Sequence, residues 1–191
     1  KAVSPYKDKA FLWFLGLQVL FAICFFQLFT TIPLYFKEGL HLSEFWIGVT
    51  MAFNGVLIAI IEMVLVFKLE GRKPYLVLMC QGTILMAISF LLLNLPIAAG
   101  LIVAFIFVLM ITFAEMIAMP FMNSYYISRS SDSNRGQYAG LYTMAWSVAQ
   151  VIGSSTGAIA ADKLGYTLLW VIISAACFVT AYGYHRLQKA K

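Results

Sequence analysis

Two glutamates stand inside long apolar stretches of this sequence, and their setting suggests chemistry. Glu62 and Glu115 each have more than a helical turn of apolar residues on both sides. A carboxylate in hydrocarbon costs about 2.5–3.5 kcal/mol on insertion scales. Acids at such positions usually face a helix-bundle interior or an aqueous cavity, where they carry protons, ions or substrate. The sequence therefore indicates a membrane transporter, or a piece of one.

The two acids differ in expected depth. Glu115 falls near the middle of its apolar stretch, so it is the first candidate for a proton-coupling residue. A hydrogen bond that ties helices together and a direct contact with substrate are the alternatives. Glu62 is the second coupling candidate, about one and a half helical turns from the expected cytoplasmic face. An ion pair with Lys68 or with a basic loop residue would also explain it.

Amides and aromatic residues accompany the acids. Asn54, Glu115 and Gln150 fall at similar depth in three different apolar stretches. Such amides can bind substrate, or they can hydrogen-bond between helices. Aromatic rings near them suit a pocket for planar or cationic molecules. The candidate substrate-binding residues are Gln27, Asn54, Asn123, Tyr126, Trp146 and Gln150, whereas Trp13, Trp46 and Trp170 lie near stretch ends and are expected to be interfacial anchors.

Small residues recur every four positions in one stretch. Gly153 and Gly157 lie between Ala149 and Ala161 on one helical face, which allows a neighbouring backbone to approach closely. We expect these two glycines to serve helix packing. Pro120, five residues after Glu115, should weaken its helix there and free a backbone carbonyl.

The composition is that of a protein dissolved in lipid. The chain is 62% hydrophobic and 11% charged, against about 25% charged residues in soluble domains. No period-two alternation indicates strands. We expect an all-α membrane protein with six transmembrane helices, arranged as two inverted three-helix repeats. The expected helices are Lys9–Phe36, Ser43–Phe67, Pro74–Asn94, Ala98–Ser128, Gly136–Ala161 and Gly165–His185.

Loop charges predict the orientation. With the N-terminus in the cytoplasm, all but two of the 13 Lys and Arg residues fall on the cytoplasmic side, Lys37 and Lys163 being the exceptions. This bias is typical of cytoplasmic loops. We expect both termini in the cytoplasm of a multi-pass protein of the plasma (inner) membrane. Residues 1–9 would end a linker, residues 10–186 would form the bundle, and residues 187–191 would be a tail.

The remaining composition argues against other classes. The net charge of +5 follows from the loop bias and does not call for nucleic acid. Three Cys and two His have no metal-ligand spacing, so no metal is expected. No hydrolase or metalloprotease motif is present, which argues against an enzyme, and no cofactor is expected.

Four short motifs are similar to parts of one transporter family. In the loop after the second expected helix, Gly71, Arg72 and Lys73 resemble the end of the signature Gly-x-x-x-Asp-Arg-x-Gly-Arg-Arg, although Lys68 and Leu69 stand where its Asp and first Arg belong. The other three matches are Asn54-Gly55 with the apolar run to Glu62, Glu115-Met116 with Pro120 followed by Arg135-Gly136-x-Tyr138-x-Gly140, and Gly153-x-x-x-Gly157-Ala158.

Taken in order, these motifs resemble the C-terminal six-helix half of the major facilitator superfamily, and most closely its bacterial drug/proton antiporters. The resemblance implies a twelve-helix carrier whose other half precedes Lys1, with a small-molecule substrate and protons as partners. Efflux of amphipathic or drug-like molecules by alternating access is the expected function. Uptake of a nutrient or metabolite, and a non-transporting six-helix scaffold, are the alternatives.

Overall fold

The computed structural model describes residues 4–96 and 99–190, and these residues form helices and connecting loops. The expected helix start at Ala98, residues 1–3 of the expected linker and Lys191 of the expected tail lie outside the described residues. The elements are η1 (Pro5–Lys7), α1 (Lys9–Phe25), η2 (Phe26–Leu28), α2 (Thr31–Glu38), α3 (Glu44–Leu69), α4 (Tyr75–Leu92), α5 (Gly100–Arg129), α6 (Arg135–Leu164) and α7 (Tyr166–Lys189).

Each expected helix has a counterpart in the structure, with ends that differ by a few residues. Five helical segments in the described part of the chain are long and apolar enough to cross a membrane: 9–38, 44–69, 75–92, 100–129 and 166–189. The sixth, α6, is 30 residues long but is not among the five. Residues 187–189, expected in the tail, continue α7.

The first expected helix is interrupted, which the sequence analysis did not predict. α1 ends at Phe25, a single turn of tighter helix follows, and α2 begins at Thr31. Pro33 explains the interruption, because its ring clashes with the carbonyl four residues earlier and its nitrogen has no hydrogen to donate. A side chain donates a hydrogen bond to one of the backbone carbonyls at the interruption: Thr30 Oγ1 donates to the carbonyl of Phe26 at 3.1 Å.

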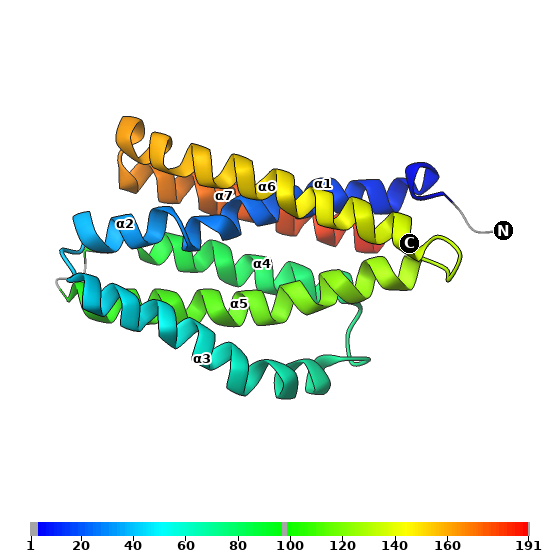
Figure 1. Ribbon diagram of the computed structural model, residues 1–191, viewed down its shortest axis with the longest axis horizontal. Helices are drawn as coiled ribbons and strands as arrows, with labels where there is room; N and C mark the ends of the chain where they lie inside the picture. Colours follow the sequence, from blue (N-terminus) through cyan, green and yellow to red (C-terminus); the bar gives the residue numbers. More distant parts are fainter. Residues whose placement is uncertain (1–3, 97–98, 191) are drawn as a thin grey trace.

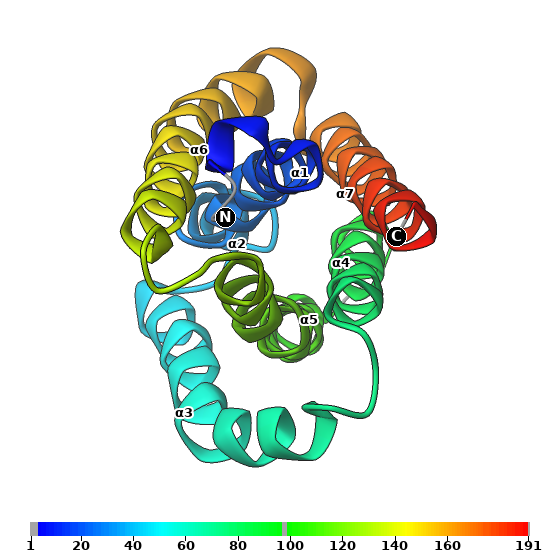
Figure 2. The ribbon, with the colours of Figure 1, turned by 90° about the vertical axis from the view of Figure 1, so that its right-hand side faces the viewer.

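The long helices run roughly parallel to one axis (Figure 1). Seen along that axis, α1 lies between α6 and α7, and α5 lies between α3 and α4 (Figure 2). α4 and α7 also pack against each other and join the two groups. α1 begins and α7 ends at the same end of the bundle, where the α3–α4 and α5–α6 loops also lie.

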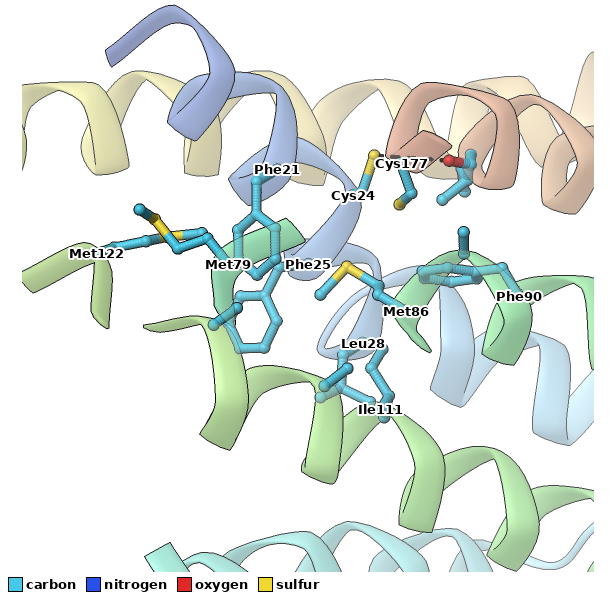
Figure 3. Packing of buried hydrophobic residues seen from close by; sticks show 14 of the residues in the cluster. Phe21, Cys24, Phe25, Leu28, Met79, Met86, Phe90, Ile111, Met122 and Cys177 are labelled. Carbon is cyan, nitrogen blue, oxygen red and sulfur yellow. Dashed lines mark hydrogen bonds between the residues drawn. The ribbon is translucent and has the colours of Figure 1, made fainter. Parts of the chain in front are cut away.

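Aromatic rings and methionines fill the centre (Figure 3). Phe21 and Phe25 of α1 face Met79 and Met86 of α4 across the core, and Met122 of α5 approaches from the side. Flexible methionines fill the irregular space that an interrupted helix leaves beside it. The core side of the break in α1–α2 is therefore covered by packed apolar side chains.

Trp170 corrects one expectation. It was expected to anchor the helix at a membrane interface, but its side chain is 0% exposed. Its ring packs on Phe90 and Tyr166 and edge-on against Tyr35. Its position near the start of α7 suggested an anchor, but contacts between helices determine its role. Trp13 and Trp46 are exposed.

Two helices leave broad apolar surfaces uncovered. Along α3 only Thr50 and Asn54 are buried, whereas Val56, Ile60, Met63, Val64 and Phe67 are exposed. α6 likewise exposes Met144, Val148, Val151, Ile152 and Ile159. Surfaces of this kind are stable only against lipid or another protein surface.

Candidate functional site

A buried polar cluster joins α3 to α5. The side-chain amide of Asn54 donates a hydrogen bond to Thr112 Oγ1 at 2.9 Å and a second, short one to Glu115 Oε1. Asn54, Thr112 and Glu115 are 7%, 0% and 5% exposed. Thr112 and Glu115 lie one helical turn apart on α5, so one amide from α3 reaches both.

Thr112 was not predicted as part of the site. Its hydroxyl accepts from Asn54 and donates to the carbonyl of Val108 at 2.6 Å, so it has one donor and one acceptor role. Its position three residues before Glu115 was the only sequence signal. The hydroxyl fixes the direction of the Asn54 amide, and that amide then faces the carboxyl.

The arrangement suits a carboxyl that binds and releases a proton. Glu115 lies at the middle of α5, at residue 16 of a helix that spans 100–129. Its first oxygen accepts from a neutral amide, and none of the ion pairs in the described part of the chain includes it. A neutral donor does not fix the charge of the acid, so protonation need not break the contact between the helices.

Glu62 makes no hydrogen bond to this cluster among the described residues, but it is close enough for its charge to act on Glu115. It is half-buried, two turns further along α3, on the face that carries Asn54. The ion pairs within residues 4–96 and 99–190 join Lys37 to Glu44, Asp8 to Arg129 and Asp132 to Arg135. The suggested Glu62–Lys68 ion pair is thus absent from the described part of the chain.

The other amide candidates are not brought to Glu115. Asn123 and Gln150 are exposed, and Gln150 lies on α6, whose main contacts are with α1. Gln27 is buried in the helix break and is fully engaged there. Its Nε2 donates to the carbonyls of Ile23 at 3.0 Å and Gly153 at 2.9 Å, and its Oε1 accepts from Thr31 at 2.6 Å.

The two aromatic candidates belong to one group of rings between α1, α5 and α6. Tyr126 and Tyr142 lie 4.5 Å apart between ring centroids, and Tyr142 is 6.4 Å from Trp146. Trp146 also stands edge-on to Phe21, Phe25 and Phe26 of the broken helix. Tyr142 was not predicted, although it precedes Trp146 by one helical turn.

The glycines of α6 lie directly on the break. A Cβ at Gly153 would come within 3.0 Å of the Ile23 carbonyl, and a Cβ at Gly157 would overlap Gln27 Oε1 and Thr31 Oγ1. Since α6 has no side chain at these positions, the carbonyl of Gly153 can accept from Gln27. The close approach of α6 to the break allows the Gln27–Gly153 hydrogen bond, and that bond in turn holds the two helices together.

An ion pair that the sequence analysis missed closes one end of the bundle. Arg129 donates to both carboxyl oxygens of Asp8, at 2.7 and 2.6 Å, while Tyr138 donates to one of them at 3.1 Å. Asp8 also caps α1 by accepting from the backbone N–H of Phe11. Burial alone would raise the pKa of Asp8, but hydrogen bonds from Arg129, Phe11 and Tyr138 and the charge of Arg129 lower it overall.

The loop motifs lie at the same end. Gly71 has a φ of 73°, a conformation that glycine adopts without strain. Arg72 is exposed, Lys73 donates to Gln81 at 3.3 Å, and Arg135 beside Gly136 pairs with Asp132 at 2.8 Å. Residues 4–96 and 99–190 contain no group of three His, Cys, Asp or Glu side chains placed to hold a metal ion.

Long apolar helices with an acid buried between two of them are features of a multi-pass membrane protein. Residues 2–154 match the family model described as Major Facilitator Superfamily, and the chain belongs to that superfamily. It is also similar to a Na(+), Li(+), K(+)/H(+) antiporter of Planococcus maritimus, at 24% identity over 160 residues. That alignment covers 76% of this chain and 37% of the relative's length.

Proposed function

We propose that this chain is the C-terminal six-helix half of a proton-coupled antiporter, and that Glu115 carries the coupling proton. The observation that carries the proposal is the buried Glu115 carboxyl, held by the neutral amide of Asn54 between two helices. A purely structural link between helices needs no acid at this position. An acid there is costly, and proton exchange gives it a use.

Six spans and an inverted repeat are part of the proposal. At 30 residues, α6 would extend about 45 Å, well over the roughly 30 Å of hydrocarbon, although it is the least apolar long helix. If α1–α2, α3 and α4 are taken as equivalent to α5, α6 and α7, the observed helix contacts occur in matching pairs. The α1–α6 contact then corresponds to the α5–α3 contact, and α1–α7 corresponds to α5–α4. The α4–α7 contact corresponds to itself. This correspondence supports two equivalent triplets.

The exposed faces of α3 and α6 support a missing partner. Both are broad and apolar, and they belong to equivalent positions in the two triplets. In the proposed carrier they would contact the N-terminal six-helix half of the same protein, around a central cavity, except at the last two turns of α3, where Met63 and Phe67 would face lipid. The lipid bilayer would cover the remaining surface, and both termini would lie in the cytoplasm, at the plasma membrane.

Glu115 would alternate between two states. Protonated, it would be a neutral partner of Asn54 within the closed α3–α5 contact. Deprotonated, it would favour the conformation in which water reaches it, since a charge is costly in the dry state. Glu62, two turns away on the Asn54 face, would relay the proton toward the basic end of the bundle.

Amphipathic or drug-like molecules are the proposed substrates. The Tyr126, Tyr142 and Trp146 rings, which are tilted against one another, supply an aromatic surface, and Asn123 and Gln150, both exposed, supply hydrogen-bonding groups. Gln27 is the least suitable of the proposed ligands, because its amide already serves the helix break.

A monovalent cation is the second candidate substrate. The similar protein of Planococcus maritimus is named for exchange of Na⁺, Li⁺ and K⁺ against protons. In secondary transporters, unwound backbone at a helix break can coordinate such ions. At the α1–α2 break, the side chains of Gln27 and Thr30 would first have to release the carbonyls that they now cap. Nutrient uptake and a non-transporting scaffold remain as alternatives that the same experiment separates.

The test uses the full-length gene product in everted membrane vesicles. A pH gradient is formed, and its collapse is followed by acridine orange fluorescence after addition of NaCl, LiCl, KCl or a panel of amphipathic cations. We expect one of these classes to collapse the gradient, and Glu115→Gln to abolish the response while downhill exchange of the same substrate persists. Glu70→Gln, which removes an exposed loop acid, is the matched control and should respond as wild type.

The outcomes are distinct. A Glu115→Gln protein that still couples, with an unchanged pH profile, would remove this residue from the mechanism and leave Glu62 or an acid of the other half. Transport unaffected by the pH gradient would favour uptake without proton coupling. No transport of any tested solute, in a protein that accumulates normally, would favour a scaffold.

A further inference from the structure

A cavity opens at the end of the bundle where the α3–α4 loop covers the ends of three helices. Its volume is about 440 Å³. The α3–α4 loop and the start of α4 form one wall, and the last turns of α5 and α7 form the other. The lining side chains that can bind a ligand are Arg72, Lys73, Tyr75, Tyr125, Ser128 and Gln188.

The chemistry of this lining favours an anion. Arg72 and Lys73 bring two positive charges, and the described residues that line the cavity include no Asp or Glu. Neither cation belongs to an ion pair in the described part of the chain. Glu70 lies in the same loop, but it is not among the lining residues. The two cations can therefore both serve a bound anion.

The start of α4 adds to this preference. α4 begins at Tyr75 inside the cavity wall, and no side chain caps its first turn. The free N–H groups and the positive end of the helix dipole favour a negatively charged group there. The Gln188 amide on the opposite wall provides a neutral donor, whereas the Ser128 hydroxyl already donates to the carbonyl of Tyr125 at 2.8 Å. A tetrahedral phosphate, with several acceptor oxygens, fits this set of donors.

Apolar surface next to the cavity indicates where that phosphate comes from. The cavity lies at the ends of helices that are long and apolar enough to cross a membrane, where lipid headgroups are expected. Met63 and Phe67, in the last two turns of α3 that lead into the same loop, are 84% and 82% exposed. A lipid whose phosphate lies at Arg72 and Lys73 can place its acyl chains against this surface.

We propose that this cavity binds the headgroup phosphate of an anionic phospholipid from the adjoining leaflet. Arg72 and Lys73 hold the phosphate, the α4 N-terminus faces it, and the end of α3 contacts the chains. The bound lipid connects the α3–α4 loop to α5 and α7. The site is independent of Glu115 and of the transported substrate.

The test is lipid retention by the delipidated full-length protein, measured by native mass spectrometry with added dioleoylphosphatidylglycerol or dioleoylphosphatidylcholine. Wild type should retain one phosphatidylglycerol in preference to phosphatidylcholine. R72Q/K73Q should weaken this binding about 25-fold, since each basic side chain near a lipid surface contributes about fivefold. K7Q/K9Q is the matched control, because it removes two charges outside the cavity lining and should keep the wild-type affinity.

Three results would overturn the proposal. Equal retention by wild type and R72Q/K73Q would show that the cavity does not hold the lipid. An equal loss in K7Q/K9Q would show a general effect of net charge. Displacement of the lipid by millimolar inorganic phosphate, without any preference for phosphatidylglycerol over free phosphate, would assign the site to a soluble phosphate compound. Arg72 and Lys73 are exposed, so their replacement leaves the packed core unchanged.

Discussion

Asn54 on α3 and Glu115 on α5 are hydrogen-bonded to each other in the interior of the bundle, 61 residues apart in sequence. α3 contributes only one other buried residue, Thr50. The Asn54–Glu115 bond is therefore a large part of what specifies how α3 docks on α5. Glu115 therefore lies at the contact made by α3, which is the least buried of the five long apolar helices in the described part of the chain.

Replacement of Asn54 by leucine should loosen this contact and change the behaviour of the acid together. Loss of one interhelical hydrogen bond costs about 0.6–1.7 kcal/mol in a membrane protein, and an unpaired carboxyl adds to that cost. We expect a lower thermal unfolding temperature in detergent and a shifted pH profile of transport. Gln137→Leu, a similar change at an exposed amide near the start of α6, should leave both unchanged. Identical behaviour of the two variants would contradict a special role for Asn54.

The sequence predicted the helices well, because a membrane span needs a long apolar run and such runs are visible in one chain. Pro33 was a local signal for the α1–α2 break, but the break was not predicted. One of the groups that stabilise it, the backbone carbonyl of Gly153, belongs to a helix distant in sequence. α6 was expected among equal spans, but its Ser, Thr and Gly residues make it less apolar than the other five.

For the site, local spacing predicted the faces of helices but not their partners. Asn54 and Glu115 were expected at similar depth, and they are in contact, whereas Gln150 lies on a helix with other neighbours. The Asp8–Arg129 pair joins residues 121 positions apart and carries no local pattern. Pairing across helices depends on how they pack, and a single sequence does not contain that information.

Gly157 should tolerate no side chain, because a Cβ there would overlap the oxygens of Gln27 and Thr31. Gly157→Ala should destabilise the protein by about 1–3 kcal/mol, the usual cost of overpacking, and Gly157→Leu should prevent normal accumulation. Thermal unfolding monitored by near-UV circular dichroism measures the first effect, and expression level the second. Gly140→Ala on the same helix meets nothing within 4 Å and should be neutral or stabilising. A Gly157→Leu protein that accumulates normally but changes its substrates would show that this face lines the binding site.

Asp8→Asn should weaken the closed end of the bundle in a pH-dependent way. The pKa of Asp8 is lowered in the folded protein, so its stabilising contribution is complete above its ordinary value of 3.8 and is lost as the pH falls through the folded-state pKa. The free energy of unfolding of the wild type should therefore exceed that of Asp8→Asn by about 1.5–3 kcal/mol near neutral pH, which is the usual contribution of a hydrogen bond to a charged group. The difference should shrink only in strong acid.

The matched control for Asp8 is Asp132→Asn. Asp132 also accepts from an arginine, but its side chain is 96% exposed, and exposed pairs contribute little. Unfolding temperatures of the wild type, Asp8→Asn and Asp132→Asn, measured in detergent at a series of pH values, test this prediction. Equal destabilisation by both substitutions, or a difference that grows toward acid, would contradict the role assigned to Asp8.

The final prediction concerns the side of the membrane on which the basic loops lie. The α3–α4 and α5–α6 loops share one end of the bundle with the start of α1 and the end of α7, and that end carries most of the Lys and Arg residues. Since basic loops face the cytoplasm, a cysteine at Ser131 should be protected from an impermeant thiol reagent added to intact cells, and one at Glu38 should be labelled. Both positions are exposed in the structure, so protection would not reflect burial.

Cys24, Cys80 and Cys177 are first replaced by alanine or serine, and permeabilised cells, in which both new cysteines should react, provide the control. Labelling of Ser131→Cys but not of Glu38→Cys in intact cells would invert the topology and place the basic end outside.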